Sequence, residues 1–501
     1  MEVKKQWVNV AKTVFDSQVV TVCDGSIIVP DVKPDIMKIL QVDASTYLCD
    51  KSVEKGKVTL SGRVCVTVLY APEDDERSIC SIRSQFDFCE VVKNSDFDEG
   101  VTLITASAGD KVTYKLINSR KIGIEAQVSI DVRAIREDGR ECVTQIDGAE
   151  AQCRYQDVPV ETVGLYKEHT FCMEEEFSWQ DVELEEILKE NIQIRDREYK
   201  ALSDKVVVKG KAILEALYLD KNGGIGHFAK ELPFTEVMEM PGACEEDECD
   251  LTFEVKGIEL TVSGDIIRAV FDVTCSVRTE AEGCVSALTG CYFTDSEEVL
   301  EYSNLSSCQL VSRQKYRTVI KDVLTKKEST PDISGVYSAV AKPCVESVSV
   351  QKGRILVEGN LVVYVLCTTE NQEVPVTGIQ KSVPFACTID AEGAGEDCEV
   401  LLKGECEHLS TVICSADSVE IRAGILLCGR VVRRNSVSVI ADAKKGDDVP
   451  REKGILVYFV KKGDNAWDVA KRYRLCESSV REAMGENGEL KEGMKLIIPV
   501  C

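Results

Sequence analysis

Side chains that carry acid–base, nucleophilic or metal chemistry are scarce or scattered in this sequence. Its only histidines are His169, His227 and His408, which lie far apart along the chain. The 23 cysteines include no pair with the C-x-x-C spacing of zinc sites. The glycine-rich segment Asn222–Gly226 lacks the Gly-Lys-Ser/Thr of a phosphate-binding loop and is typical of a turn. We therefore expect no catalytic site, no metal and no cofactor, and predict that the protein is not an enzyme.

The charge balance argues against nucleic acid and membrane partners. In 501 residues, 60 Lys and Arg stand against 86 Asp and Glu, and the net charge of −26 repels phosphates. No run of about 18 apolar residues occurs, so we expect no membrane span. No secretory signal pattern follows Met1, which predicts a cytoplasmic protein.

Many cysteines stand within alternating apolar segments, where a reduced thiol packs as a small hydrophobic group. Cys65, Cys275 and Cys428 are examples. In a chain without an export signal, this placement favours reduced, buried thiols over a disulfide framework.

The C-terminal segment holds the most specific candidate binding residues. Its pattern predicts a strand, a turn, two helices and a closing strand, in the order Val457–Lys461, Lys462–Asp464, Asn465–Tyr473, a helix opening at Ser479–Glu482, and Gly493–Pro499. Asp464 is placed to cap the first helix, and the Ser479–Glu482 pattern is a capping box.

This order and spacing resembles the LysM module. The resemblance is carried by Tyr458, Gly463, Asp464, Trp467, Ala470, Tyr473, Gly493, Leu496, Ile498 and Pro499. LysM modules that bind N-acetylglucosamine polymers use the loop after the first strand and the loop after the second helix. Here Asn465-Ala466 replaces the usual Thr-Leu, and Met484 stands where Asn is common.

Both loops that face the sugar in LysM modules are thus altered, which favours a groove that binds protein. Met suits such a contact, because its thioether is a weak acceptor that packs against varied shapes. The residues near this groove are Asp464, Asn465, Ala466, Met484, Glu486 and Asn487. Trp467 is instead expected in the core of the module.

The chain upstream of this module repeats itself. Strictly alternating segments are centred on Gly62, Gly210 and Gly359, which are 148 and 149 residues apart. Further landmarks recur at similar spacing: Ile39-Leu40 with Ile187-Leu188, the aromatics Phe86, Phe234 and Phe385, and the pairs Val132-Arg133, Val277-Arg278 and Val432-Arg433. Each unit is long enough to bury a core of its own.

The repeats predict a mainly β protein with three tandem β-sandwiches or barrel-like units, each covered at one end by a short helix at its Ile-Leu segment. The glycines are expected to serve structure. We place the repeats at residues 16–140, 170–300 and 312–443, a linker at 444–453 and the module at 455–501, and expect each folded part to fold alone.

The repeats resemble the SPOCS domain of spore-coat proteins from endospore-forming Firmicutes. Val29–Ile36, Gly62-Arg63-Val64 and Asn118–Ile122 carry the resemblance in the first repeat. The second repeat has Asp181–Leu184 in place of the Pro-Asp segment, and the third keeps Pro331-Asp332 but lacks the Arg-Lys pair. These differences in sequence suggest that the three copies have different functions.

SPOCS repeats followed by LysM are the arrangement of clostridial spore-coat morphogenetic proteins. This similarity implies work in the mother-cell cytoplasm at the forespore surface. There the LysM module is expected to engage the ATPase of the coat's basement layer, and the repeats are expected to recruit further coat protein or self-associate. The alternative is a cell-wall protein that binds peptidoglycan of the cell wall or cortex through LysM.

Overall fold

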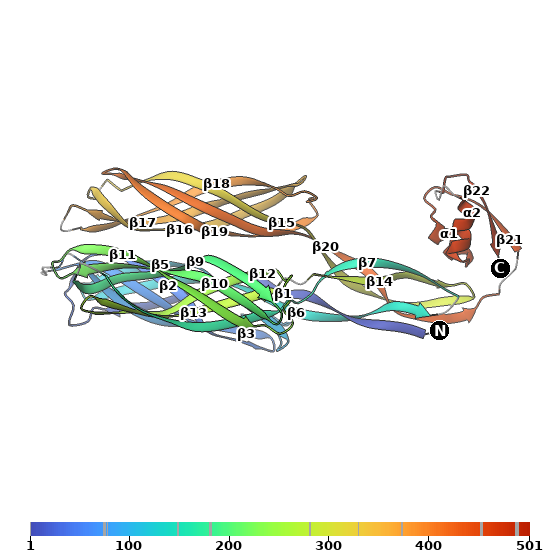
Figure 1. The fold of residues 1–501 in the computed structure, drawn as a ribbon, viewed down its shortest axis with the longest axis horizontal. Coiled ribbons are helices and arrows are strands. Elements are labelled where there is room, and N and C mark those ends of the chain that lie inside the picture. Colours follow the sequence, from blue (N-terminus) through green and yellow to red (C-terminus); the bar gives the residue numbers. More distant parts are fainter. Residues whose placement is uncertain are drawn as a thin grey trace.

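The computed structural model describes residues 2–73, 77, 79–147, 150–179, 183–279, 282–328, 330–371, 374–450, 454–485 and 490–500. Long antiparallel strands fill most of the molecule, and a small module with two helices lies at one end (Figure 1). The predicted mainly β fold is confirmed. Within those ranges, no helix has the length and apolar character needed to span a bilayer.

The strands group into three repeats and a C-terminal module. Repeat 1 contains β1 (Glu2–Ile28), β2 (Ile36–Glu54), β3 (Lys57–Pro72), β4 (Cys80–Lys93), β5 (Val101–Asn118) and β6 (Lys121–Asp147). Repeat 2 contains β7 (Ala151–Glu161), β8 (Tyr166–Ser178), β9 (Leu184–Leu202), β10 (Lys205–Asp220), β11 (Ile225–Glu239), β12 (Cys249–Ser263), β13 (Ile266–Thr279) and β14 (Glu282–Phe293). Repeat 3 contains β15 (Ser296–Thr325), β16 (Ile333–Gln351), β17 (Arg354–Thr369), β18 (Val376–Asp390), β19 (Cys398–Ser415) and β20 (Ser418–Asp448). The module contains β21 (Gly454–Phe459), α1 (Ala466–Tyr473), α2 (Glu477–Met484) and β22 (Lys495–Val500).

Each repeat is a sandwich of two three-stranded antiparallel sheets with one topology. The first sheet is a meander, ordered β2-β3-β4, β9-β10-β11 and β16-β17-β18 in the three repeats. The second sheet joins the first and last strands, in the orders β1-β6-β5, β8-β13-β12 and β15-β20-β19. The repeat period found in the sequence is therefore a repeat of topology.

The central glycines make room for an aromatic ring on the neighbouring strand. A Cβ on Gly62 would lie 2.5 Å from the ring of Phe88, its cross-strand partner. The same contact occurs in the other repeats, between Gly210 and Phe234 and between Gly359 and Phe385. The structural role expected for these glycines is confirmed. In repeat 1, however, the partner is Phe88 and not the predicted Phe86.

The helices predicted at the Ile-Leu segments are wrong, because these residues lie in strands. Ile187 and Leu188 belong to β9 and point to opposite faces of their sheet. Ile187 packs in the sandwich core, whereas Leu188 packs against the other repeats. A strand buried on both faces has adjacent apolar residues, and this pattern resembles the spacing of a helix.

The three repeats meet in one apolar cluster built from equivalent positions. Leu69 of β3, Leu217 of β10 and Leu366 of β17 all belong to it, and they are 148 and 149 residues apart. Leu40, Leu188 and Tyr337 form a second equivalent set in the same cluster. Equivalent side chains can share one cluster only if the repeats surround a common axis with approximate threefold symmetry. We call this cluster the axial cluster.

Beyond the sandwiches the chain forms a stalk of three two-stranded ribbons. It comprises residues 2–13 with 135–147, 151–161 with 282–293, and 296–310 with 432–448. All three ribbons contribute to its core, which contains Val8, Val10, Cys142, Val158, Val160, Ala287, Leu305 and Val439. Figure 1 shows the ribbons leaving one end of the sandwiches side by side.

The ribbons bend away from the sandwiches at equivalent residues. Bulges skip Val14 in β1 and Val311 in β15, which are 297 residues apart, the sum of the two periods. At the corresponding point in repeat 2 the strand is interrupted between β7 and β8. Gly164 lies in this interruption, and its lack of a side chain permits a close approach to Thr279, because a Cβ there would lie 1.9 Å from the Thr279 carbonyl oxygen. A β-bulge turns a strand while keeping most of its pairing.

One carboxylate of repeat 2 pairs with an arginine of its own repeat and two arginines of repeat 3 where the sandwiches meet the stalk. Glu161, at the end of β7, lies 3.6 Å from Arg278 and 3.7 Å from both Arg430 and Arg434. Burial lowers the pKa of Arg278, and the neighbouring Arg133 and Arg430 lower it further. Because cations of three repeats approach one another here, Glu161 offsets a repulsion that the compact arrangement creates.

In repeat 3, the arginine that is equivalent to Arg133 and Arg278 is not Arg433 of the predicted Val-Arg pair. Arg433 instead donates to Asp397 at the surface, and Arg430 takes the place beside Arg278.

The strands also run past the predicted repeat boundaries. Repeat 1 begins at Glu2 and ends at Asp147, and β20 continues to Asp448, so five residues of the expected linker lie in a strand. Residues 451–453 of that linker lie outside the described ranges. Residues 444–448 are polar because they form the end of an exposed ribbon.

Truncation in the axial cluster should destabilise the whole sandwich body. We expect Leu217→Ala to lower the free energy of unfolding by about 2–5 kcal/mol, because it leaves a cavity among three repeats. Denaturant unfolding measures this change. Val237→Ala, on the exposed face of β11 in the same sheet, is the matched control, and an equal effect of both variants would contradict the shared core.

Neutralising Glu161 should cost more than neutralising a surface carboxylate. Glu161→Gln removes the carboxylate that Arg278, Arg430 and Arg434 share, for which we expect a loss of about 3–5 kcal/mol. Glu407→Gln, which breaks the exposed pair with Arg317, should change stability by less than about 1 kcal/mol. Equal midpoints for the two variants in urea would show that Glu161 is dispensable.

Candidate functional site

The C-terminal module has the predicted strand–helix–helix–strand order. Strands β21 and β22 pair antiparallel, with Val457 opposite Ile497. One face of this two-stranded sheet packs on the helices through Tyr458, Leu496 and Ile498, all buried. Trp467 is buried in the same cluster, as expected.

Asp464 and Asn465 have structural duties at the start of α1. The N-cap is Asn465, not the predicted Asp464: its side-chain oxygen accepts a hydrogen bond from the Asp468 amide at 2.9 Å. The Asp464 carboxylate accepts from the Tyr458 hydroxyl and from the Lys461 amide. These bonds lower the pKa of Asp464. The turn is therefore held closed by its own residues.

Helix α2 begins earlier than predicted, and its last residue is part of the core. It starts at Glu477 after the N-cap Cys476, so Ser479 lies inside the helix and caps nothing. Met484 is buried together with Val480, one helical turn before it. Met484 is therefore a packing residue, contrary to its predicted place in a groove. The four-residue spacing from Val480 was the signal for this role.

The four predicted groove residues in the described part of the chain thus do not share one open surface. Ala466 is buried, Asp464 is half-buried and Asn465 is exposed. Glu486 and Asn487 lie outside the described residues. A binding role for the exposed Asn465 stays a prediction.

The module is seated on the stalk through an aromatic contact that sequence reasoning missed. The rings of Tyr292 on β14 and Trp467 on α1 meet edge to face, with their centroids 5.0 Å apart. The Tyr292 hydroxyl donates to the Leu475 carbonyl at 2.7 Å, and Tyr292 is fully buried. A Cβ on Gly290 would lie 3.0 Å from the Trp467 ring, so this glycine permits the close approach.

Polar contacts complete the seat. Arg474 donates to the carbonyls of Phe293, at 3.1 Å, and Ser296, and pairs with Glu298. The Glu477 amide donates to the Gln152 side chain at 3.1 Å. Since these partners come from β7, β14 and β15, the module holds a fixed orientation at the end of the stalk (Figure 1).

The opposite face of β21 and β22 is apolar and uncovered. Ile455, Val457, Phe459 and Ile497 project from it, and Phe459 is 61% exposed. Three exposed lysines, Lys461, Lys462 and Lys495, lie at its Phe459 end. None of the three has an ion pair with another residue in the described ranges. We call this surface the outer face of the module.

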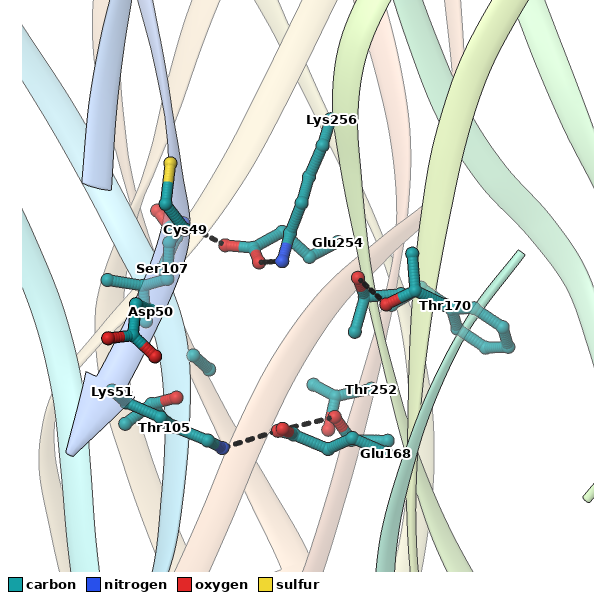
Figure 2. A pocket seen from close by; sticks show the side chains of 15 residues that line it. Cys49, Asp50, Lys51, Thr105, Ser107, Glu168, Thr170, Thr252, Glu254 and Lys256 are labelled. Carbon is teal, nitrogen blue, oxygen red and sulfur yellow. Dashed lines mark hydrogen bonds and ion pairs between the residues drawn. The ribbon is translucent and has the colours of Figure 1, made fainter. Parts of the chain in front are cut away.

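A second candidate is the cleft between repeats 1 and 2, with a volume of about 450 Å³ (Figure 2). Strands β2 and β5 form one wall, and β8, β12 and β13 form the other. Lys51 crosses it to pair with Glu168 at 2.5 Å, and Glu254 accepts from the Leu48 amide at 3.1 Å. Thr170 and Thr274 bond to each other at 2.9 Å.

These charged groups are satisfied across the interface and join the two repeats. Tyr166 and Ser276 also donate to Glu168. In the part of the chain that the structure describes, no group of three or more His, Cys, Asp or Glu is placed to hold a metal ion. The cleft therefore serves cohesion between repeats better than chemistry.

Comparison with protein families matches this repeated architecture. The model described as "SipL, SPOCS domain" matches residues 35–117, 183–263 and 332–414, once in each sandwich. The chain belongs to the SipL SPOCS-domain family. Its role is accordingly related to sporulation. Searches of curated proteins and of solved structures found no match.

The SPOCS motif residues in repeat 1 form a structural clamp. Arg120 pairs with Asp35 at 2.5 Å and donates to the Val29 and Pro30 carbonyls. Ser119 donates to the other Asp35 oxygen, and these bonds lower the pKa of Asp35. The clamp ties the β1–β2 connection to the β5–β6 turn.

Repeat 3 makes the same connection with different residues. Lys326 pairs with Asp332 at 2.6 Å and with Asp417 at 2.8 Å, which compensates for the missing arginine. In repeat 2, Asp181 and Val182 lie outside the described residues. Repeat 3 lacks the arginine of repeat 1 but keeps the connection that this arginine makes.

Removing one hydroxyl should loosen the module without unfolding the repeats. Tyr292→Phe keeps the ring against Trp467 but leaves the buried Leu475 carbonyl without its donor, which costs about 1–3 kcal/mol. We expect faster amide exchange in α1 and faster proteolysis near Val449–Gly454, with unchanged exchange in β3. Tyr302→Phe, an exposed tyrosine on β15, is the control. Unchanged exchange in α1 would contradict this seat.

Proposed function

We propose that this protein is a non-enzymatic spore-coat morphogenesis protein that links coat proteins to the forespore surface through protein–protein contacts. The proposed partner of its C-terminal module, which resembles LysM, is the ATPase that forms the basement layer of the coat. The three repeats provide the body that holds this module in place and recruit further coat protein.

The outer face of the module is the observation that carries the proposal. A two-stranded sheet normally buries one apolar face, whereas here both faces are apolar and only one is covered by helices. Contiguous exposed apolar side chains with a polar rim mark protein interaction sites. Ile455, at 72% exposure, and Phe459 are the largest anchors on it.

Charge supports an acidic protein as the partner. Residues 454–501 contain eight Lys and Arg against seven Asp and Glu, a net charge of +1, whereas residues 1–453 carry −27. The lysines at the Phe459 end would face such a partner, and opposite charges accelerate association. The acidic remainder of the chain has the opposite sign of charge, which favours solubility.

Glycan binding has less support in the module. Asn465 is engaged as the cap of α1, and Asp464 is bound to Tyr458 and Lys461. Met484 is packed in the core. These positions leave few free polar groups to recognise the hydroxyls of an N-acetylglucosamine polymer.

Pull-down of the full-length chain by the coat-basement ATPase tests the proposal. We expect Phe459→Ala to weaken the affinity at least about tenfold, because a few exposed aromatic anchors carry much of the binding energy of an interface. The variant should stay folded, since the side chain lies outside the core. Val412→Ala, an equally exposed valine on β19, should bind as the wild type does.

Two results would contradict the proposal. One is full capture of the ATPase by Phe459→Ala together with a second outer-face variant, Val457→Glu. The other is sedimentation of the wild-type protein with purified peptidoglycan while it fails to bind the ATPase, which would favour the cell-wall function.

A further inference from the structure

Two cysteines face each other on neighbouring strands of the stalk. Cys153 of β7 and Cys291 of β14 are directly opposed in an antiparallel pair. Both are free thiols, Cys291 fully buried and Cys153 half-buried. Opposed residues in antiparallel sheets have Cβ atoms about 4.5–5.5 Å apart, and a disulfide needs about 3.5–4.5 Å. A small approach of the strands is enough to form a bond.

The two sulfurs are also hydrogen-bonded in a way that activates one of them. Cys153 accepts from the Cys291 thiol and from the Tyr155 hydroxyl, which lowers the pKa of Cys153 to about 7 although its burial opposes this. The same bond, with burial, raises the pKa of Cys291. Cys153 is therefore the more acidic thiol of the pair, and the thiolate is the reactive form.

Among the residues that the structure describes, no other two cysteines are directly opposed on paired strands. Cys284 lies on the same strand, is exposed, and is opposite Pro159. Burial raises the pKa of Cys275 to about 12 and that of Cys367 to about 11. Their thiols stay protonated and covered under the same conditions.

We propose that Cys153 and Cys291 form a peroxide-sensitive dithiol that closes to a disulfide. The Cys153 thiolate attacks one oxygen of hydrogen peroxide, the O–O bond breaks, and a sulfenic acid forms as hydroxide leaves and is protonated to water. Cys291 sulfur then attacks the Cys153 sulfur, releasing a second water as its proton is transferred. Two thiols lose two electrons, and one peroxide is reduced to two waters.

The bond would fix the seat of the C-terminal module. Gln152 and Tyr292, the immediate neighbours of the two cysteines, hold Glu477 and Leu475 of the module. A bond between β7 and β14 also closes the long loop that contains the sandwich of repeat 2, and loop closure restricts the unfolded chain. Oxidation is expected to raise the melting temperature of the protein. This inference does not depend on the proposed function.

Peroxide titration of the reduced full-length protein tests it. After limiting hydrogen peroxide, peptide mapping without reductant should find the 153–291 cross-link before any other disulfide. Cys291→Ala should instead accumulate a sulfenic acid at Cys153 that dimedone traps. Cys284→Ser should form the cross-link at the wild-type rate, and dithiothreitol should reverse the gain in melting temperature.

The pH dependence provides a second readout that does not require the disulfide. Alkylation of Cys153 by iodoacetamide should rise as the pH passes about 7, and this midpoint should move upward in Cys291→Ala, which lacks the thiol donor. The proposal is overturned if other cysteines oxidise while no 153–291 cross-link appears, or if Cys153→Ser consumes peroxide as fast as the wild type.

Discussion

Burial of the second face of each meander sheet at one end, in the axial cluster, is the constraint on which the rest of the structure depends. In β3, alternate residues such as Val66 and Val68 fill the sandwich core of repeat 1, while Leu69 points into the axial cluster. β10 and β17 do the same with Leu217 and Leu366. A single repeat would leave these leucines in water, so three repeats are needed to cover them.

The stalk and the module follow from this arrangement. Because the repeats surround one axis, their first and last strands emerge at the same end, and the ribbons bury apolar faces against one another. The ribbon of repeat 2 then offers Tyr292 and Gln152 as a platform for the module. The family's three SPOCS domains thus act as one support for the C-terminal module.

Much of this could be predicted from local patterns. Alternation revealed the long strands, the 148- and 149-residue periods revealed the repeats, and turn and capping residues revealed the order of elements in the module. These signals lie within a few residues of one another or recur at a fixed distance. The contacts of Tyr292 with Trp467 and of Glu161 with Arg430 join residues far apart in the chain and have no such signal. The helix expected at Ile187-Leu188 was wrong because these adjacent apolar residues lie on the two buried faces of one strand, and they were interpreted as one apolar face of a helix.

The central claim is that three repeats fold as one body around the axial cluster. Amide hydrogen exchange across a denaturant series measures this directly, with peptides from β3, β10 and β17 followed in the intact protein. The account predicts that the slowest amides of all three strands lose protection together, through one cooperative opening. Loss of protection at three separate denaturant concentrations, one for each repeat, would show independent domains and would contradict it.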